Sequence, residues 1–493
     1  MSLYLGIDFG TSTNVVTRWD SEKKTAQPVP LGAYGSPDIF PNVIFYESPT
    51  NKIVGRDAVT KGKLRPENAV FSIKRRLESI DFRQAIPALG RSLSSEEIAA
   101  DIFGWIKKSV EDKYGGQTID GVVISVPFAF QNRERKRIER AAGAAGLPVL
   151  GLIEEPVAAA LSFGLMDQAE RGKAEKILVF DLGGGTFDVT IFDFRKQSDQ
   201  QFAIRVITTG GAKDLGGIDI DNLMLDKVLA KMTKDHSDYR LDTRAADLQE
   251  KETFMIRQQV IEAKERLSAE DEADLFFESN LGAEFMFDDI LSQEDFSEWL
   301  RAFLVKIENV LDEALLDADL DVQDIDRIIM VGGTSNIPAI KNKVREYFGK
   351  QPQEVGKLTL MVGEGAGIYC GLKYVDKSLD CKIEVGVSQN IALKWGGKFI
   401  MMLERNTLYG TPSQLTKLIV PNLGRRDLVI PIVQGSRLRH DRIGSIPVTI
   451  AVQEKLSGGR LGVKLSTDLN NGTINYELYS GNALLESGKV GEE

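Results

Sequence analysis

Two Gly-rich motifs that each begin with aspartate constrain the fold of this chain more than any other feature. The first is Asp8-Phe9-Gly10-Thr11-Ser12, and the second is Asp181-Leu182-Gly183-Gly184-Gly185-Thr186. Each lies between two runs of apolar or alternating residues, a pattern that predicts two β-strands joined by a tight turn. One such hairpin would be weak evidence, because Gly-rich turns are common. Two of them predict a duplicated domain that holds a phosphate chain between its halves.

The second motif has the composition of a phosphate-binding loop. Its three consecutive glycines let the backbone approach a ligand closely and adopt dihedral angles closed to other residues. Backbone N–H groups exposed in such a turn, together with the Thr186 hydroxyl, can hold phosphate oxygens. Asp181 and Asp188 flank the turn, and carboxylates beside phosphates suit a Mg²⁺ ion that keeps several of its waters. The alternative for either motif alone is an ordinary Gly-rich hairpin.

Composition restricts the class of protein. With 493 residues the chain is too long for one hydrophobic core, so several domains are expected. The net charge of −11 argues against a nucleic-acid-binding surface, and no apolar run approaches the length of a membrane helix. The chain has only 2 Cys and 2 His, which are too few to favour a disulfide framework, a zinc site or histidine-based catalysis. The first residues lead directly into a strand without a signal peptide, so we expect a cytoplasmic protein.

The hydrophobic pattern changes once along the chain. Residues 1–376 alternate apolar strands with helical segments, which predicts an α/β domain. Within it, the run from Arg327 to Asn336 predicts a buried strand that leads through a Gly-Gly turn into a helix opening at Pro338, an arrangement that binds a nucleoside or phosphate. Residues 377–386 are predicted to be a linker. Residues 387–493 contain short alternating strands, which predict a separate all-β sandwich.

Several segments, taken in order, resemble the heat-shock seventy (DnaK-type) chaperone family, whose ATPase domain belongs to the actin, hexokinase and sugar-kinase superfamily. The two Gly-rich motifs are similar to its two phosphate loops. The other matching segments are Val123 to Pro127 with Arg135 (its proline switch and arginine partner), Ile153 to Leu161 (its connecting helix), Leu215 to Asp221, and Val331 to Pro338 (its adenosine motif). Sugar kinases and filament-forming actin relatives share the hairpins, but do not normally share all of these segments in this order.

The resemblance implies a two-lobed actin-like ATPase domain of duplicated ribonuclease-H-like cores, with ATP or ADP and Mg²⁺ in the interlobe cleft. It implies nucleotide contacts from Gly10, Thr11, Ser12, Gly183, Gly184, Gly185, Thr186, Gly216, Gly217, Lys264, Ser268, Gly332, Gly333, Thr334 and Asn336. Asp8, Asp181 and Asp188 would hold the metal through water. Glu155 or Asp181 would position the attacking water, with Asp8 and Thr186 also in the catalytic set, for phosphoryl transfer without a covalent step.

Some positions depart from the family's pattern. By ungapped spacing, Val59 stands where the family has a lysine that reaches the terminal phosphate, which predicts hydrolysis slower by about 10²-fold or more. Asn336 stands where an arginine usually stacks on adenine, and Ile261 where an acidic residue usually meets the ribose. The basic run from Phe71 to Leu77 is expected to be either a solvated helix end or a contact surface.

The linker and the C-terminal region also differ from the family. The usual run of leucines ending in aspartate is replaced by Leu379 to Val385, so coupling between domains of the usual kind is not expected. No helical segment follows the predicted β sandwich, so the resemblance is to a member without a helical lid. Peptides bound without a lid would exchange fast.

Two functions from different classes follow. The first is a DnaK-like chaperone that binds and hydrolyses ATP and engages unfolded or extended peptide segments through the β sandwich, where backbone hydrogen bonds and apolar pockets hold the peptide. The second is a weakly hydrolysing or non-hydrolysing regulator that uses ATP as a structural ligand and docks a dedicated protein client. The resemblance also implies a J-domain co-chaperone and a nucleotide exchange factor as partners. A sugar-kinase-like transferase is a third reading, but nothing in the sequence argues for a sugar pocket.

Overall fold

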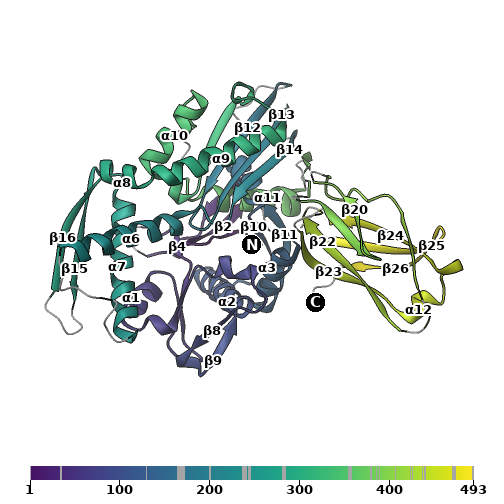
Figure 1. The fold of residues 1–493 in the computed structure, drawn as a ribbon, viewed down its shortest axis with the longest axis horizontal. Helices are drawn as coiled ribbons and strands as arrows, with labels where there is room; N and C mark the ends of the chain where they lie inside the picture. Colours follow the sequence, from purple (N-terminus) through teal and green to yellow (C-terminus); the bar gives the residue numbers. More distant parts are fainter. Residues whose placement is uncertain are drawn as a thin grey trace.

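The computed structural model consists of two α/β lobes followed by a C-terminal β module (Figure 1). It describes residues 2–33, 36–128, 130, 132–163, 172–198, 201–235, 241, 246–279, 285–353, 358–377, 380–384, 386–387, 389–405, 407–421, 424, 426–435, 437, 440–468 and 473–490. Along the chain, the first lobe comes from residues 2–163, the second from residues 172–384, and the β module from residues 386–490.

The first lobe contains a mixed sheet, two small strand groups and several helices. Its central strands are β1 (Tyr4–Phe9), β2 (Thr13–Asp20), β3 (Thr25–Pro28), β4 (Phe40–Pro41), β10 (Gly121–Val126) and β11 (Val149–Glu154). The smaller strands are β5 (Val43–Tyr46), β6 (Lys52–Val54), β7 (Ala69–Phe71), β8 (Arg83–Ile86) and β9 (Arg91–Ser94). The helices are α1 (Arg56–Leu64), η1 (Pro66–Asn68), η2 (Ile73–Glu78), η3 (Pro87–Leu89), α2 (Ser95–Lys113), α3 (Asn132–Ala144) and α4 (Glu155–Ser162).

The second lobe contains a second mixed sheet and a separate β-hairpin. Its strands are β12 (Ala174–Leu182), β13 (Phe187–Ser198), β14 (Gln201–Ala212), β15 (Glu272–Ser279), β16 (Phe285–Ser292), β17 (Arg327–Val331) and β18 (Asp380–Glu384). Its helices are α6 (Gly217–Asp235), α7 (Ala246–Arg266), α8 (Gln293–Trp299), α9 (Arg301–Ala318), η5 (Val322–Asp324), η6 (Gly333–Asn336), α10 (Pro338–Phe348), α11 (Met361–Cys370) and the π-helix η7 (Gly371–Asp376).

The two central sheets share the arrangement of four strands and differ in the fifth, which is β11 beyond β10 in the first sheet and β18 beyond β14 in the second. The first has the strand order β11-β10-β1-β2-β3 and the second β17-β12-β13-β14-β18. In each, an antiparallel meander (β1-β2-β3 or β12-β13-β14) is joined by a parallel strand beside its first strand, β10 in one lobe and β17 in the other. This shared order confirms the duplicated α/β architecture predicted from the two Asp-Gly motifs.

Helix α2 illustrates how the sequence sets the elements that cover the first sheet. Its N-terminus is a capping box, because the Ser94 side chain accepts the Glu97 N–H and the Glu97 carboxylate accepts the Ser94 N–H. Its apolar residues recur every third or fourth position, and this face is buried in the core of the first lobe, with members Ile98, Ile102, Phe103, Ile106 and Val110.

Helices α4 and α11 pack closely against each other between the lobes. Pro156 occupies the first turn of α4, where its missing N–H costs no hydrogen bond. A side chain at Gly365 of α11 would place its Cβ 1.7 Å from the Ala158 carbonyl oxygen of α4. Glycine is therefore required for this approach, and it brings the end of the second lobe against the start of the helix that carries Glu155.

The β module is a sandwich of two four-stranded antiparallel sheets. The first sheet has the order β20-β19-β22-β23 and the second β21-β24-β25-β26. The strands are β19 (Ile391–Trp395), β20 (Lys398–Leu403), β21 (Thr416–Ile419), β22 (Leu428–Gly435), β23 (His440–Val448), β24 (Arg460–Thr467), β25 (Ile474–Ser480) and β26 (Ala483–Lys489), with short helices α12 (Ile450–Gln453) and η8 (Ser457–Gly459). Alternating residues of both sheets, among them Leu393, Ile432, Leu461 and Leu478, form one buried core. The predicted all-β region is thus confirmed.

The segment predicted as a linker contributes a strand to the second lobe. Residues 380–384 form β18, which pairs in parallel with Gln201 to Arg205 of β14. Residues 378, 379 and 385 lie outside the described part of the chain.

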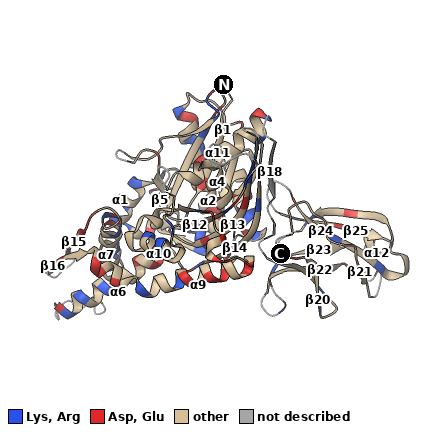
Figure 2. Ribbon diagram, turned by 90° about the horizontal axis from the view of Figure 1, so that it is seen from above, with Lys and Arg blue, Asp and Glu red and all other residues tan. Residues whose placement is uncertain are grey.

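The β module contacts both lobes (Figure 1). Figure 2 shows acidic residues on the part of α9 nearest the module. The polar contacts include Arg405 with Asp317 of α9 at 2.8 Å, the Tyr409 hydroxyl with Glu154 at 3.0 Å, and the Ile474 N–H with the Asn132 side-chain oxygen at 3.1 Å. Among the described residues, no helix combines the length and the apolar character that crossing a membrane requires.

Candidate functional site

The two Gly-rich turns face each other across the space between the lobes. One follows β1 at Gly10 to Ser12, and the other joins β12 to β13. A Cβ at Gly184 would lie 1.9 Å from the Ser12 Oγ, and a Cβ at Gly185 would lie 2.5 Å from the Thr11 Oγ1. Only glycine allows the two turns to approach this closely. The structure therefore brings together the two loops that the sequence predicts to bind phosphate.

A cavity lies between these turns. Twelve of the predicted site residues line it, namely Asp8, Gly10, Thr11, Ser12, Glu155, Asp181, Gly183, Gly184, Gly185, Thr186, Gly332 and Gly333. Five further lining residues were not predicted, namely Thr13, Lys74, Leu358, Thr359 and Val362.

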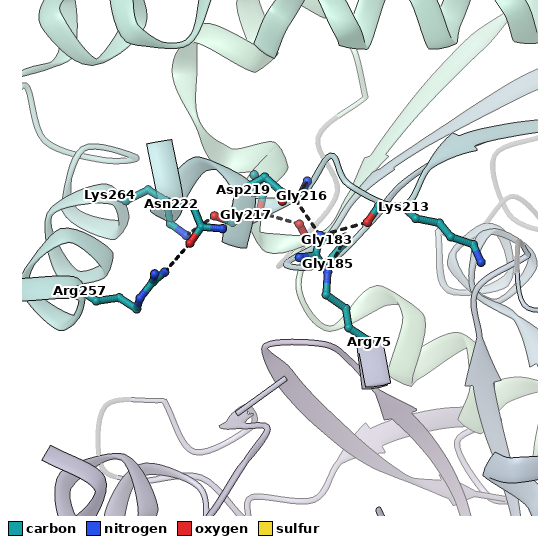
Figure 3. Close-up of polar contacts among 11 residues, drawn as sticks. Arg75, Gly183, Gly185, Lys213, Gly216, Gly217, Asp219, Asn222, Arg257 and Lys264 are labelled. Carbon is teal, nitrogen blue, oxygen red and sulfur yellow. Dashed lines mark hydrogen bonds and ion pairs between the residues drawn. The ribbon is translucent and has the colours of Figure 1, made fainter. Parts of the chain in front are cut away.

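The residues predicted to contact the nucleoside gather on one side of the second phosphate loop. The Gly217 N–H and the Thr334 hydroxyl donate to the Gly183 carbonyl at 3.0 and 2.9 Å. Lys264 pairs with Asp221 at 2.6 Å and lies 3.4 Å from the Gly217 carbonyl. Figure 3 shows Lys264 and Gly217 beside Gly183 and Gly216.

Two predicted nucleoside contacts are engaged locally. The Ser268 hydroxyl donates to the Lys264 carbonyl at 3.2 Å, and the Asn336 side chain donates to the Gly333 carbonyl at 3.1 Å. Asn336 therefore orders the turn of η6, and Ser268 the end of α7, in addition to any ligand contact.

Lys74 of η2 places a lysine in the cavity, although the sequence predicts that Val59 leaves the site without one. Its Nζ pairs with Glu155 Oε1 at 2.5 Å inside the cavity, and its side chain is 5% exposed. The expectation of a missing lysine is therefore wrong. Val59 lies on α1, where it packs against a small apolar cluster that includes Val43 and Phe45. The ungapped spacing pointed to α1, whereas the lysine in the cavity comes from a different element.

The local structure of η2 explains why Lys74 turns inward. Ser72 adopts a left-handed conformation, with φ of 53°, that starts the helix. At the other end, the buried Arg137 guanidinium donates to the carbonyls of Leu77 and Ser79 at 2.6 and 3.0 Å. At Lys74, the basic run from Phe71 to Leu77 is thus buried and is not a solvated helix end. The available sequence signal was the placement of this lysine directly after an apolar residue, Ile73, which is buried.

The electrostatic balance of the cavity is negative. Burial lowers the pKa of Lys74, but the Glu155 and Asp8 carboxylates outweigh it and hold the pKa above its usual value. Burial, and then Glu155, raise the pKa of Asp8 to about 6 and that of Asp188 to about 7. Burial and Glu155 also raise the pKa of Asp181 well above its usual range. One lysine thus faces four buried carboxyl groups, and a further cation would stabilise their charged forms.

The donor set fits a phosphate chain with Mg²⁺. Glycine backbone and hydroxyl groups line the cavity, and the Asp188 Oδ2 atom is buried without a hydrogen-bond partner among the described residues. Within the same residues, no three or more His, Cys, Asp or Glu side chains are grouped to coordinate a metal directly. Carboxylates that hold Mg²⁺ through its waters would suit the reluctance of this ion to dehydrate.

Replacing Asp188 by asparagine is expected to stabilise the nucleotide-free protein at pH 8. The carboxyl pKa is about 7 in the folded chain and 3.8 in a model peptide. Between these pH values the folded state therefore binds more protons than the unfolded state, so the stability of the wild type falls as the pH rises. The variant should gain on the order of 2–4 kcal/mol at pH 8 and much less at pH 5.

Thermal unfolding at the two pH values measures this effect. Asp193→Asn, on the same strand but half-exposed and 3.8 Å from Lys176, is the matched control and should change little. A lower unfolding temperature for Asp188→Asn at pH 8 would contradict the expectation.

A buried ion pair connects the site with the β module. Arg135 of α3 pairs with Glu154 at 2.9 Å, with side chains 3% and 6% exposed, and donates to the Phe130 carbonyl at 3.1 Å. Tyr409 of the β module donates to the same Glu154 carboxylate. Glu154 directly precedes Glu155, so the carboxyl group in the cavity and the one at the module interface are neighbours in the chain. Sequence reasoning named Arg135 but missed Glu154 and Tyr409.

One family model, described as "Hsp70 protein", matches residues 4–446. Among curated proteins, the chain is 33% identical over 444 residues to the "Chaperone protein DnaK" of Thermotoga neapolitana, covering 88% of this chain and 70% of that protein. It is 31% identical over 472 residues to the protein of the same name from Deinococcus deserti, covering 89% and 70%. The corresponding protein of Thermosipho melanesiensis is 31% identical over 443 residues, covering 88% and 70%.

Proposed function

The chain belongs to the Hsp70 family, and from this premise we propose that it is a chaperone. In this proposal it binds Mg-ATP between its lobes and hydrolyses it to ADP and phosphate. The nucleotide state is coupled to the binding of extended peptide segments. Hsp70 proteins are typically ATPases and generally bind ATP or ADP with Mg²⁺. The single observation that carries the proposal for this chain is the Lys74–Glu155 pair in the cavity between two glycine turns.

In this proposal the two turns hold the phosphates. The hydroxyls of Thr11, Ser12 and Thr186 and the backbone N–H groups of the glycines donate to phosphate oxygens. The nucleoside lies toward Gly217, Lys264 and Thr334, which adjoin the second turn. When bound, Mg²⁺ would supply positive charge to the phosphates, and Asp8, Asp181 and Asp188 would hold its waters.

Hydrolysis would depend on positioning and electrostatics. The Glu155 carboxylate, or that of Asp181, orients a water for attack on the terminal phosphate, and Lys74 offers its charge where negative charge develops. Lys74 is suited to this role because its raised pKa keeps it protonated at neutral pH. Its pairing with Glu155 also fixes both side chains before the ligand arrives.

Coupling to the β module would use the contacts between the parts. Strand β18 joins the module to the sheet that carries the second phosphate loop. Arg405 and Tyr409 bridge to Asp317 and Glu154. A change in the separation of the lobes would therefore move both β18 and the face of the β module that carries Arg405 and Tyr409. The departure of residues 379–385 from the family's leucine run does not prevent strand pairing, which uses backbone groups.

The alternative, a regulator that does not hydrolyse ATP, loses the main argument for it, because Lys74 supplies the missing charge. Its remaining support is Asn336 in place of an adenine-stacking arginine, together with the altered linker sequence from Leu379 to Val385. Extended or unfolded peptide segments, a J-domain co-chaperone and a nucleotide exchange factor are the partners that family membership supports.

Single-turnover hydrolysis of radiolabelled ATP by the full chain tests the proposal. With Mg²⁺ present, we expect labelled phosphate to appear; after chelation of the metal by EDTA, hydrolysis should fall by at least about 10²-fold, because the carboxylates then lose the cation that offsets their charge. Tight binding of ATP without hydrolysis would favour the regulator. Absence of nucleotide binding would overturn both readings.

A further inference from the structure

Arg75 of η2 reaches from the first lobe across to the second. Its Nε donates to the Gly185 carbonyl of the second phosphate loop at 3.0 Å. Its Nη2 also lies 3.0 Å from the Lys213 carbonyl and 2.7 Å from the Asp219 carboxylate. Figure 3 shows the arginine rising from the first lobe to the Gly-rich segments of the second. The guanidinium thus binds the phosphate loop and the segment that leads into α6 at the same time.

A second ion pair joins the same two segments. Glu78 of η2 pairs with the ammonium group of Lys213 at 2.6 Å. In a 3₁₀-helix, residues three apart lie on the same face, so Arg75 and Glu78 are placed one above the other toward the second lobe. The lobe contact is therefore reciprocal: Lys213 offers its carbonyl to the arginine and its ammonium to the glutamate.

The second lobe is prepared to receive the arginine. The Asp219 carboxylate accepts the Gly216 N–H at 2.9 Å, which holds it at the start of α6 while it binds Arg75. A Cβ at Gly216 would lie 2.7 Å from the Gly185 carbonyl carbon, so glycine lets this segment rest directly on the phosphate loop. The contact surface consists of fixed backbone groups and one anchored carboxylate.

We propose that Arg75 and Glu78 form an interlobe latch that holds the cleft closed over the phosphates and sets the rate at which nucleotide leaves. The inference rests on the proposed function, since it assumes a nucleotide in the cleft. Lys74 and Arg75 are consecutive residues of one short helix, one directed into the cavity and the other to the opposite lobe. Separation of the lobes therefore breaks the latch and displaces the lysine together.

The latch is strong enough to influence release. An arginine that binds two carbonyls and a carboxylate makes several charge-assisted hydrogen bonds, and its planar group matches such a set better than a lysine would. Opening the cleft exchanges these bonds for water. Loss of one charge-assisted contact corresponds to roughly a tenfold change in an equilibrium or rate. The exposed Glu78–Lys213 pair contributes less.

Arg75→Gln is the variant that tests the latch, and Arg76→Gln is its matched control. Arg76 is the next residue of the same helix, is exposed, and contacts the Phe82 ring of its own lobe. With Mg²⁺ present, dissociation of N-methylanthraniloyl-ADP from the full chain is followed by stopped-flow fluorescence. We expect about tenfold faster dissociation for Arg75→Gln and no change for Arg76→Gln. Equal rates for the two variants and the wild type would overturn the latch.

A second measurement uses the nucleotide-free protein. Amide hydrogen exchange of peptides that cover Gly183 to Gly185 and Lys213 to Gly217 should be faster in Arg75→Gln than in Arg76→Gln. If the wild type fails to bind the ADP probe, the proposed function fails, and this measurement alone decides whether Arg75 holds the two lobes together. Unchanged exchange in both segments would then overturn it.

Discussion

Lys74→Met is expected to slow single-turnover ATP hydrolysis by about 10²- to 10³-fold while leaving ATP bound. The lysine is the single cation among the described residues that line the cavity, and it lies 2.5 Å from Glu155. A fixed charge aimed at developing negative charge typically contributes on this scale. Most contacts to the phosphates would come from the glycine turns and hydroxyls, so affinity should change much less than the rate.

Two further variants make the result specific. Lys61→Met removes a lysine of α1 that pairs with Glu47 outside the cavity, and it should leave the rate unchanged. Val59→Lys combined with Lys74→Met should not restore hydrolysis, because Val59 packs against the Phe45 cluster rather than the cavity. ATP-dependent thermal stabilisation verifies that each variant is folded and binds. Wild-type hydrolysis by Lys74→Met would remove Lys74 from the mechanism, and rescue by Val59→Lys would mean that a lysine on α1 can reach the phosphates after all.

Arg135→Met is expected to reduce the free energy of unfolding by about 3–5 kcal/mol. The substitution leaves the Glu154 carboxylate buried with only the Tyr409 hydroxyl as a described polar partner. Removing one member of a buried ion pair typically costs this much, because the remaining charge is desolvated without compensation. Urea unfolding followed by circular dichroism measures the effect. The contact between the β module and the first lobe should be lost as well.

The matched double variant separates charge from packing. Arg135→Met with Glu154→Gln removes both charges, so it should recover much of the lost stability. Tyr409→Phe keeps the ion pair and should cost no more than about 1–2 kcal/mol. An Arg135→Met protein as stable as the wild type would mean that water reaches the Glu154 carboxylate.

The architecture was predictable because its signals are local. A strand of alternating residues, a glycine turn and a returning strand are all encoded within about fifteen residues, and the repetition of that unit implied the two lobes. The change to short alternating strands after residue 386 likewise needed no knowledge of long-range contacts. Glu155 was placed correctly at the start of a helix because Pro156 marks the first turn.

The parts that were missed depend on distance in the sequence. Lys74 reaches Glu155 only because a left-handed residue at Ser72 and the remote Arg137 shape η2. Counting residues from Gly55 assumed that the lysine lay on α1, and no periodicity could correct that assumption. The interface residue Tyr409 had no local signature, because its partner lies in the first lobe, far away along the chain.

The pairing of β18 with β14 has a consequence for the ATPase region in isolation. A sheet that ends in an uncovered strand offers a row of free N–H and C=O groups to any other extended chain. Residues 380–384 occupy such a row along Gln201 to Arg205. A fragment ending before residue 380 would leave this border open and exposed to self-association. Strand β18 thus also protects the edge of β14 from aggregation for as long as the two strands stay paired.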